Sequence, residues 1–306
     1  MLAMGAPVDR LKSVVGRRVR RLAGQPDLQR RIAELEKRVA TLEKAGGGST
    51  KERRRAARKK ARTSGLGGTA PDRGAPAAAQ TAEVEAAVVA VKEQRLTYLT
   101  LPALRALAVT VDELERDELP GIIVEAGTAL GGSAVVIALS KSPERRFVAH
   151  DMFGLIPPPG DEDGDDVHER YATIVAGRSS GLGGDTYYGY REDLLGEVTA
   201  TFDRFGVPVD QNAIELVPGL FQDTISGDEP IALAHVDGDW YESTMVCLER
   251  FGPRIVPGGR FVIDDYFSWS GCRTAVEEYF TDRDGWSFEQ RGGKVHIVRA
   301  AADPHA

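Results

Sequence analysis

The sequence of 306 residues lacks the segments that mark a membrane-spanning or exported protein. It has no run of about 18 apolar residues, which is the length that a membrane-spanning helix needs. The first forty residues are rich in Arg and Lys and contain no apolar core, so they do not resemble a signal peptide. We therefore expect a cytoplasmic protein without a transmembrane segment.

Cysteines and nucleotide-binding motifs are also scarce. The two cysteines, Cys247 and Cys272, have neither a metal-binding nor a disulfide spacing, which is typical of thiols in a reducing compartment. No GxGxxG and no GxxxxGK[ST] pattern is present. These absences disfavour binding of a dinucleotide or a nucleoside triphosphate.

The charge is divided unevenly along the chain. Residues 1–75 contain 20 Lys and Arg against 7 Asp and Glu, a net charge of +13, whereas the remainder carries −20. We predict three parts: a basic helical arm with a short coiled coil at 1–44, a disordered basic linker at 45–81 and a folded domain at 82–300.

The basic arm has two features that suggest partners. Apolar residues at 28, 32, 35, 39 and 42 follow the 4-3-4-3 spacing of a coiled coil, which would assist a homo-oligomer, although a solitary amphipathic helix has the same spacing. The block KERRRAARKKAR at 51–62 would attract nucleic acid or an anionic membrane. Because no aromatic residue interrupts it for base stacking, we favour a solvated segment over either partner.

From residue 82 onward, apolar runs alternate with segments of helical periodicity. Five runs read as strands followed by helices, and two more form a hairpin around Gly292 and Gly293; the seven strands are expected at 121–125, 146–150, 213–217, 231–236, 260–263, 287–290 and 294–299. This order predicts an α/β fold with a mostly parallel seven-stranded sheet and an antiparallel edge strand. In such sheets the ligand lies at the carboxyl ends of the strands.

The first two strands end in residues suited to a nucleoside. The first runs into EAGTALGGS at 125–133, a glycine-containing turn that exposes backbone N–H groups to a ligand. The second ends at Asp151, whose carboxylate can accept hydrogen bonds from ribose hydroxyls. A nucleoside site without a pyrophosphate cradle points to S-adenosylmethionine.

Four carboxylates follow the fourth and fifth strands. Asp237 and Asp239 come after the fourth strand, and Asp264 and Asp265 come after the fifth. Neighbouring parallel strands would bring them to one crevice, where carboxylates suit a hard cation such as Mg²⁺. Helix capping is the alternative, because Asp often precedes a helix, but it explains only one Asp at each position.

The segments VEAGTALGGSA, LVPGLFQDT, HVDGDWYEST and PGGRFVIDDYF occur in this order between about residues 85 and 299. Together they resemble the macrocin O-methyltransferase family. This resemblance implies a Rossmann-like class I methyltransferase that uses S-adenosylmethionine and Mg²⁺ to methylate hydroxyls of sugars on secondary metabolites.

The resemblance also implies roles for individual residues. Asp237, Asp264 and Asp265 match the magnesium ligands, and Asp239 matches the general base. The residues that match the S-adenosylmethionine site are Glu125, Gly127, Thr128, Ser133, Asp151, Gly219 and Asp223. Residues 157–188 match a mobile lid over the acceptor.

Two alternatives stay open at this point. The acceptor could be a phenolic or peptidic metabolite instead of a glycoside, or the domain could be a catalytically silent assembly module. Among the histidines, His150, His235 and His296 are interpreted as structural, whereas His168 lies in the predicted lid and could contact the acceptor. Three tyrosines at 187, 188 and 190 would pack the lid or stack on a sugar.

Overall fold

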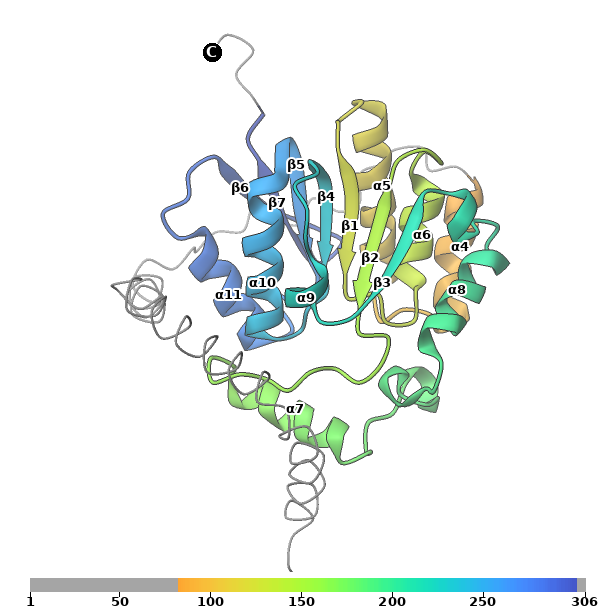
Figure 1. The fold of residues 1–306 in the computed structure, drawn as a ribbon, viewed down its shortest axis with the longest axis vertical. Coiled ribbons are helices and arrows are strands. Elements are labelled where there is room, and N and C mark those ends of the chain that lie inside the picture. The colour runs from red at the N-terminus through yellow and green to blue at the C-terminus, as the bar shows by residue number, and fades with distance from the viewer. Residues whose placement is uncertain (1–81, 302–306) are drawn as a thin grey trace, which may run out of the picture. The chain divides into compact units, whose positions relative to one another are not determined.

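The computed structural model describes residues 82–301, so the predicted arm and linker lie outside the described residues. The described residues form a seven-stranded sheet in the order β3-β2-β1-β4-β5-β7-β6 (Figure 1). The strands are β1 Ile122–Ala126, β2 Phe147–Asp151, β3 Ile214–Pro218, β4 Ile231–Val236, β5 Ile255–Ile263, β6 Trp286–Arg291 and β7 Lys294–Arg299. Pairing from β3 through β5 is parallel, and β7 runs antiparallel to both β5 and β6. The predicted α/β class, strand number and antiparallel edge are confirmed.

Helices cover both faces of this sheet, as Figure 1 shows. Their bounds are α4 Ala82–Glu93, α5 Leu101–Arg116, α6 Gly132–Ser140, α7 Asp165–Val175, α8 Leu194–Arg204, α9 Phe221–Thr224, α10 Tyr241–Phe251 and α11 Ser270–Phe280. Short 3₁₀ turns occupy Leu182–Gly184, Tyr188–Tyr190, Val209–Gln211 and Gly252–Arg254. Within the described residues, no helix is both long enough and apolar enough to cross a bilayer.

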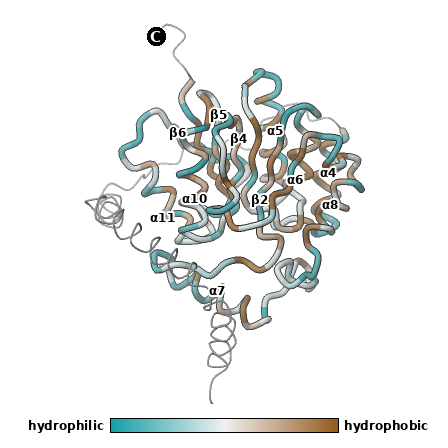
Figure 2. The backbone as a smooth tube through the Cα atoms, viewed as in Figure 1, coloured by the Kyte–Doolittle hydropathy of each residue, from teal (hydrophilic) through white to brown (hydrophobic). Residues whose placement is uncertain are grey.

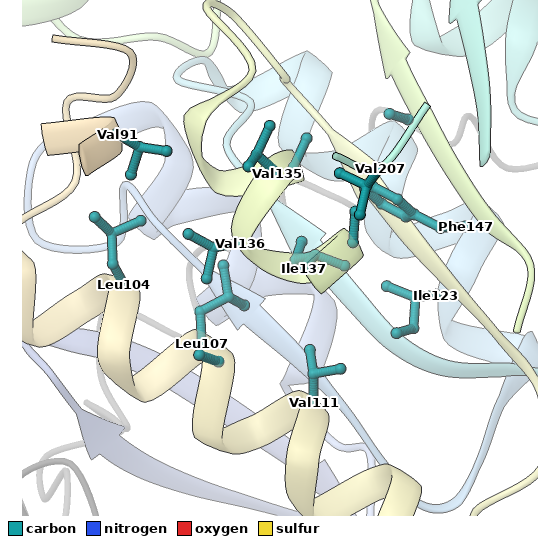
Figure 3. Packing of buried hydrophobic residues seen from close by; sticks show 14 of the residues in the cluster. Val91, Leu104, Leu107, Val111, Ile123, Val135, Val136, Ile137, Phe147 and Val207 are labelled. Carbon is teal, nitrogen blue, oxygen red and sulfur yellow. The ribbon is translucent and has the colours of Figure 1, made fainter. Parts of the chain in front are cut away.

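The core has two apolar layers because successive residues of each strand point to opposite faces. One layer packs β1 residue Ile123 and β2 residue Phe147 against α4, α5, α6 and α8 (Figure 3). The other packs Val124 and Ile263 against α10 and α11. Figure 2 shows strands β4 and β5 and helix α6 largely in the brown of hydrophobic residues.

Helix α5 illustrates how the local sequence fixes an element. Its first turn is capped by Thr100, whose side-chain oxygen accepts a hydrogen bond from the N–H of Ala103 at 3.3 Å. Pro102 occupies the first turn, where a missing N–H costs nothing. Leu104, Leu107 and Val111 follow at helical spacing and are buried against the sheet.

Strand β5 is longer than the sequence analysis predicted. It begins at Ile255 instead of Arg260, and its register with β4 shifts between Ile231 and Leu233. Gly258 lies within this irregular part with φ of +84°, a conformation that glycine adopts without strain. The Pro-Gly-Gly segment therefore bulges within the strand, which is why the apolar pattern indicated only its second half.

Candidate active site

The turn after β1 packs directly against the end of β4. Gly127 has φ of +96°, and a Cβ atom placed there would lie 1.9 Å from the backbone oxygen of Asp237. The backbone N–H of Asp237 also donates to the carbonyl of Ala126 at 2.8 Å. Glycine at this position is thus required for the close approach of the turn to the β4 loop.

Asp151, at the end of β2, holds the same turn from the other side. Its Oδ2 accepts hydrogen bonds from the N–H groups of Thr128 at 2.7 Å and Ala129 at 2.9 Å, and its Oδ1 accepts from Phe153 N–H at 2.6 Å. Burial raises the pKa of Asp151, and these three backbone bonds oppose that shift. Asp151 therefore fixes the shape of the turn as well as facing the pocket.

Three carboxylates converge where β4 and β5 end. Asp237, Asp239 and Asp265 each offer an oxygen, and these oxygens lie within 4.8 Å of one another. The backbone N–H of Asp239, a residue with φ of +55°, donates to Asp265 Oδ2 at 3.0 Å. The β4 loop is thus folded so that two of its carboxylates point at the carboxylate from β5.

This crowding changes the acidity of the group. Burial, followed by repulsion from Asp265, raises the pKa of both Asp237 and Asp239 well above the ordinary value. Burial and the neighbouring Asp264 raise the pKa of Asp265 to about 6. The cluster therefore has the charge and the donor set that a hard divalent cation would stabilise.

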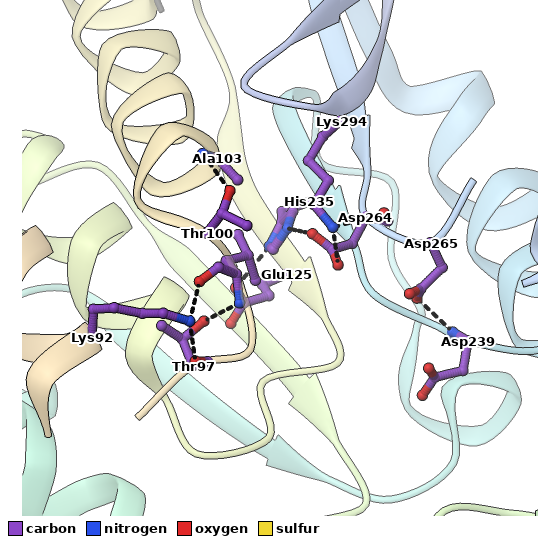
Figure 4. Close-up of polar contacts among 11 residues, drawn as sticks. Lys92, Thr97, Thr100, Ala103, Glu125, His235, Asp239, Asp264, Asp265 and Lys294 are labelled. Carbon is purple, nitrogen blue, oxygen red and sulfur yellow. Dashed lines mark hydrogen bonds and ion pairs between the residues drawn. The ribbon is translucent and has the colours of Figure 1, made fainter. Parts of the chain in front are cut away.

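Asp264 is oriented differently from the other three carboxylates. Its Oδ2 accepts from Lys294 Nζ at 2.7 Å, and its Oδ1 lies 4.0 Å from Nε2 of His235 (Figure 4). Lys294 also donates to the backbone carbonyl of Asp264 at 3.0 Å. The antiparallel pairing of β7 with β5 places this lysine beside the acidic cluster.

A cavity of about 320 Å³ opens above these groups. Its floor contains Gly127, Asp151, Asp237, Asp239, Asp264 and Asp265. Aromatic side chains also line it, namely Tyr98, Tyr187, Tyr188, Trp240 and Trp269. Arg170 of α7 also faces the cavity, with its guanidinium 5.5 Å from the centre of the Tyr187 ring. The lining of the cavity thus combines carboxylates with aromatic side chains.

Residues 157–188, the predicted lid, form one side of the cavity and are attached to the β4 loop. The indole N–H of Trp240 donates to the carbonyl of Pro157 at 3.0 Å, and the N–H of Tyr241 donates to Asp163 at 2.8 Å. Pro157, Arg170 and Ile174 line the cavity. The segment lies where a lid would lie, and its mobility stays a prediction.

Comparison with known proteins adds to this geometry. Residues 93–285 match the macrocin O-methyltransferase (TylF) family. The chain belongs to this family.

Two curated relatives are similar over the same region. One is the 8-demethyl-8-(2,3-dimethoxy-alpha-L-rhamnosyl)-tetracenomycin-C 4'-O-methyltransferase of Streptomyces olivaceus, which is 34% identical over 60% of this chain and 67% of its own length. The other is the mycinamicin III 3''-O-methyltransferase of Micromonospora griseorubida, 32% identical over 63% of this chain and 73% of that protein. The structure of the O-methyltransferase NovP shares the fold, with a TM-score of 0.57 and 20% identity over 72% of this chain and 97% of NovP. The prediction of an S-adenosylmethionine-dependent O-methyltransferase is confirmed.

The residues that the family resemblance assigned to the cofactor fall into two groups. Gly127, Asp151 and Gly219 line the cavity. The others lie outside its lining: Glu125, Thr128 and Ser133 are buried, and Asp223 is exposed on α9. Their cofactor roles stay predictions.

Three of the histidines are buried, as a structural role requires, and one of these three also contacts the acidic cluster. His150 is buried and its Nδ1 lies 3.2 Å from Thr224 Oγ1, and His296 is buried in β7. His168 is exposed on α7 and does not line the cavity. His235 is wholly buried, and its ring lies between Glu125 and Asp264: Nδ1 is 2.9 Å from Glu125 Oε1, and Nε2 is 4.0 Å from Asp264 Oδ1.

Sequence reasoning missed several cavity residues. Tyr98 lies in the loop between α4 and α5, Arg170 in α7, and Trp269 immediately before α11. Tyr98 and Arg170 follow no parallel strand, and Trp269 lies five residues beyond Asp264 in the loop after β5, so the rule for strand ends did not select them. Lys294 was missed as well, because the predicted hairpin joins β6 to β7 and does not show that β7 also pairs with the end of β5.

Proposed function

We propose that this member of the macrocin O-methyltransferase family transfers the methyl group of S-adenosylmethionine to a hydroxyl of a sugar on a secondary metabolite, with Mg²⁺ at the acidic cluster. The observation that carries this proposal is one cavity lined by the glycine turn and four carboxylates, three of which have oxygens within 4.8 Å of one another. The name of the tetracenomycin relative, which describes O-methylation of a compound that carries a rhamnosyl group, supports the acceptor class.

For the cofactor, we infer a site along the edge formed by Gly127, Asp151 and Gly219. Gly219 has φ of +140°, so the β3 loop turns sharply as it meets this edge. Asp151 keeps the oxygen lone pairs that its backbone partners leave free, and these are available to ribose hydroxyls. The three residues come from three neighbouring strand ends, the usual place for a nucleoside in this fold.

For the cation, we propose Asp237, Asp264 and Asp265 as ligands. Burial and then repulsion between neighbouring carboxylates raise the pKa of Asp237 and Asp265, and a divalent cation fits because it would stabilise their charged forms. When bound, such a cation lowers the pKa of a coordinated hydroxyl.

Asp239 is the proposed general base. Its carboxylate lies with those of Asp237 and Asp265, within reach of a hydroxyl held at the cluster. Burial and the neighbouring carboxylates raise its pKa, so it is a stronger proton acceptor than an ordinary aspartate. Asp239 would take the hydroxyl proton while the acceptor oxygen forms its bond to the methyl carbon and the carbon–sulfur bond breaks.

The test is methyl transfer followed by mass spectrometry, with glycosides, simple phenols and peptides as candidate acceptors, each with Mg²⁺ and with EDTA. Transfer to glycosides that EDTA abolishes is the expected result. Transfer to phenols or peptides alone would overturn the acceptor class, and undiminished transfer in EDTA would overturn the metal.

A matched pair of variants distinguishes the proposed base, Asp239, from the proposed metal ligand, Asp264. Asp239→Asn should lower kcat at least a hundredfold and leave Mg²⁺ affinity within about threefold, since general-base catalysis contributes about 10²–10⁴. Asp264→Asn should weaken Mg²⁺ binding. The reverse pattern would make Asp239 the ligand, as its position within the 4.8 Å cluster also permits.

Three further predictions from the sequence concern the basic arm and the location of the protein. A homo-oligomer assisted by residues 28–44, contact of the basic block with nucleic acid or an anionic membrane, and a cytoplasmic location all stay predictions.

A further inference from the structure

A row of polar side chains crosses the sheet beneath the acidic cluster, on the face covered by α5. Glu125 of β1 and His235 of β4 are neighbours in register, and both have 0% of their surface exposed. His235 Nδ1 lies 2.9 Å from Glu125 Oε1. Figure 4 shows the imidazole between Glu125 on one side and Asp264 on the other, with Lys294 beyond Asp264.

Two facing atoms in this row lack partners. Among residues 82–301, His235 Nε2 and Asp264 Oδ1 are both buried without a hydrogen bond, and they lie 4.0 Å apart. An unpartnered buried polar atom costs about 1–3 kcal/mol. A movement of about 1 Å would bring the two atoms to hydrogen-bond distance.

The surroundings show that His235 is not an ordinary packing residue. The other residues of its strand, IALA-V, are apolar and wholly buried. Glu125 is also the only charged residue in β1 and does not line the cavity. An apolar pair would fill this layer at lower cost, since buried polar groups need partners. A specific role at Asp264 accounts for both residues.

We propose that His235 is a positioning residue for Asp264: Glu125 holds the imidazole, and the imidazole fixes the Asp264 carboxylate from inside the sheet. Lys294 holds the other oxygen of this carboxylate at 2.7 Å. Glu125 then acts on the acidic cluster through His235, not on the cofactor. This inference rests on the proposed function in so far as Asp264 is a cation ligand.

Two substitutions of His235 separate its two contacts. The amide of Asn reaches the position of Nδ1, so His235→Asn retains a partner for Glu125 and loses the atom that faces Asp264. The longer Gln places its amide near Nε2, so His235→Gln retains the contact with Asp264. His296 is the matched control, because it is also a buried histidine on this face of the sheet, lies opposite Val262 and lines no part of the cavity.

The measurements are Mg²⁺ affinity by calorimetry, S-adenosylmethionine affinity, kcat and melting temperature for each folded variant. Partners of metal ligands typically contribute 10–100-fold to metal affinity, so His235→Asn should weaken Mg²⁺ binding about tenfold or more. S-adenosylmethionine affinity should stay within about twofold, His235→Gln should recover most of the Mg²⁺ affinity, and His296→Asn should resemble the wild type. Glu125→Met removes the partner that holds the imidazole but keeps the imidazole itself, so it should weaken Mg²⁺ binding less than His235→Asn does.

Two results would overturn the inference. One is equal Mg²⁺ affinity and equal kcat in wild type, His235→Asn and His235→Gln. The other is a Glu125→Met variant that loses only S-adenosylmethionine binding, which would place Glu125 at the cofactor. If the wild type binds no Mg²⁺, the proposed metal site is wrong, and kcat of the two His235 variants then tests the positioning role by itself. A lower kcat for His235→Asn than for His235→Gln supports this role, and equal values overturn it.

Discussion

Removing one charge from the acidic cluster should stabilise the metal-free protein. Asp265 is buried beside Asp264, and its pKa is raised from 3.8 to about 6. Because the folded state holds this proton more tightly than the unfolded chain does, the free energy of unfolding falls as the pH rises from about 4 to about 6, and the full loss is present above pH 6. Asparagine keeps the size of the side chain and an oxygen that can accept the Asp239 N–H.

The magnitude follows from the shift. The pKa of Asp265 is about two higher in the folded state than in the unfolded chain, which lowers the free energy of unfolding by about 3 kcal/mol at pH 7.5. Weakening the hydrogen bond from Asp239 N–H offsets about 1 kcal/mol of this gain. For a domain of this size, 1 kcal/mol moves the melting temperature by about 2–4 °C, so Asp265→Asn should melt roughly 4–8 °C higher than the wild type in EDTA.

Two conditions check the cause of this gain. At pH 5 the wild-type carboxylate is mostly protonated in the folded state, so the charge-dependent part of the gain should fall to about half. Saturating Mg²⁺ should reverse the order, because it stabilises the wild type and not the variant. Scanning fluorimetry at both pH values, with EDTA and with Mg²⁺, measures all four cases. A lower melting temperature for Asp265→Asn in EDTA at pH 7.5, or a gain that does not shrink at pH 5, would refute the reasoning.

Three further changes test other parts of the site. Gly127→Ala should lower the free energy of unfolding in urea by more than about 3 kcal/mol or prevent folding, since its Cβ would lie 1.9 Å from the Asp237 oxygen. The control Gly177→Ala, with φ of +69° and open space around it, should lower it by only about 1 kcal/mol. Trp240→Phe removes the hydrogen bond to Pro157, so steady-state kinetics should show a higher KM for the acceptor with an unchanged KM for S-adenosylmethionine; an equal rise in both would contradict a role confined to the lid segment. Asp151→Asn leaves one acceptor oxygen in place of two for three backbone N–H groups, and calorimetry should show S-adenosylmethionine binding at least tenfold weaker; unchanged binding would separate Asp151 from the cofactor site.

The arrangement of the acidic residues was predictable because it depends on few choices. Once the runs ending at Val236 and Ile263 are recognised as adjacent parallel strands, the aspartates that follow them must share one edge of the sheet. The apolar runs also located all seven strands, with the start of β5 as the main error, since a bulge does not repeat with the period of a strand.

The partners of these residues were harder to predict, for a physical reason. All five residues of β1 are buried, because both faces of this strand are covered by helices. Its apolar pattern therefore does not show that Glu125 points to the α5 face and away from the cavity. Arg170 reaches the cavity from α7, which follows an irregular loop whose path depends on tertiary contacts such as Trp240 with Pro157. Strand periodicity carries no information about either contact.

The central claim is a divalent cation held by the cluster around Asp237. Calorimetric titration of Mg²⁺ into the EDTA-treated protein, saturated with S-adenosylhomocysteine, tests it most directly. We predict one Mg²⁺ per chain for the wild type and none for Asp237→Asn, with S-adenosylhomocysteine binding intact in both. Absence of Mg²⁺ binding in the wild type, or equal Mg²⁺ binding in Asp237→Asn, would contradict the claim.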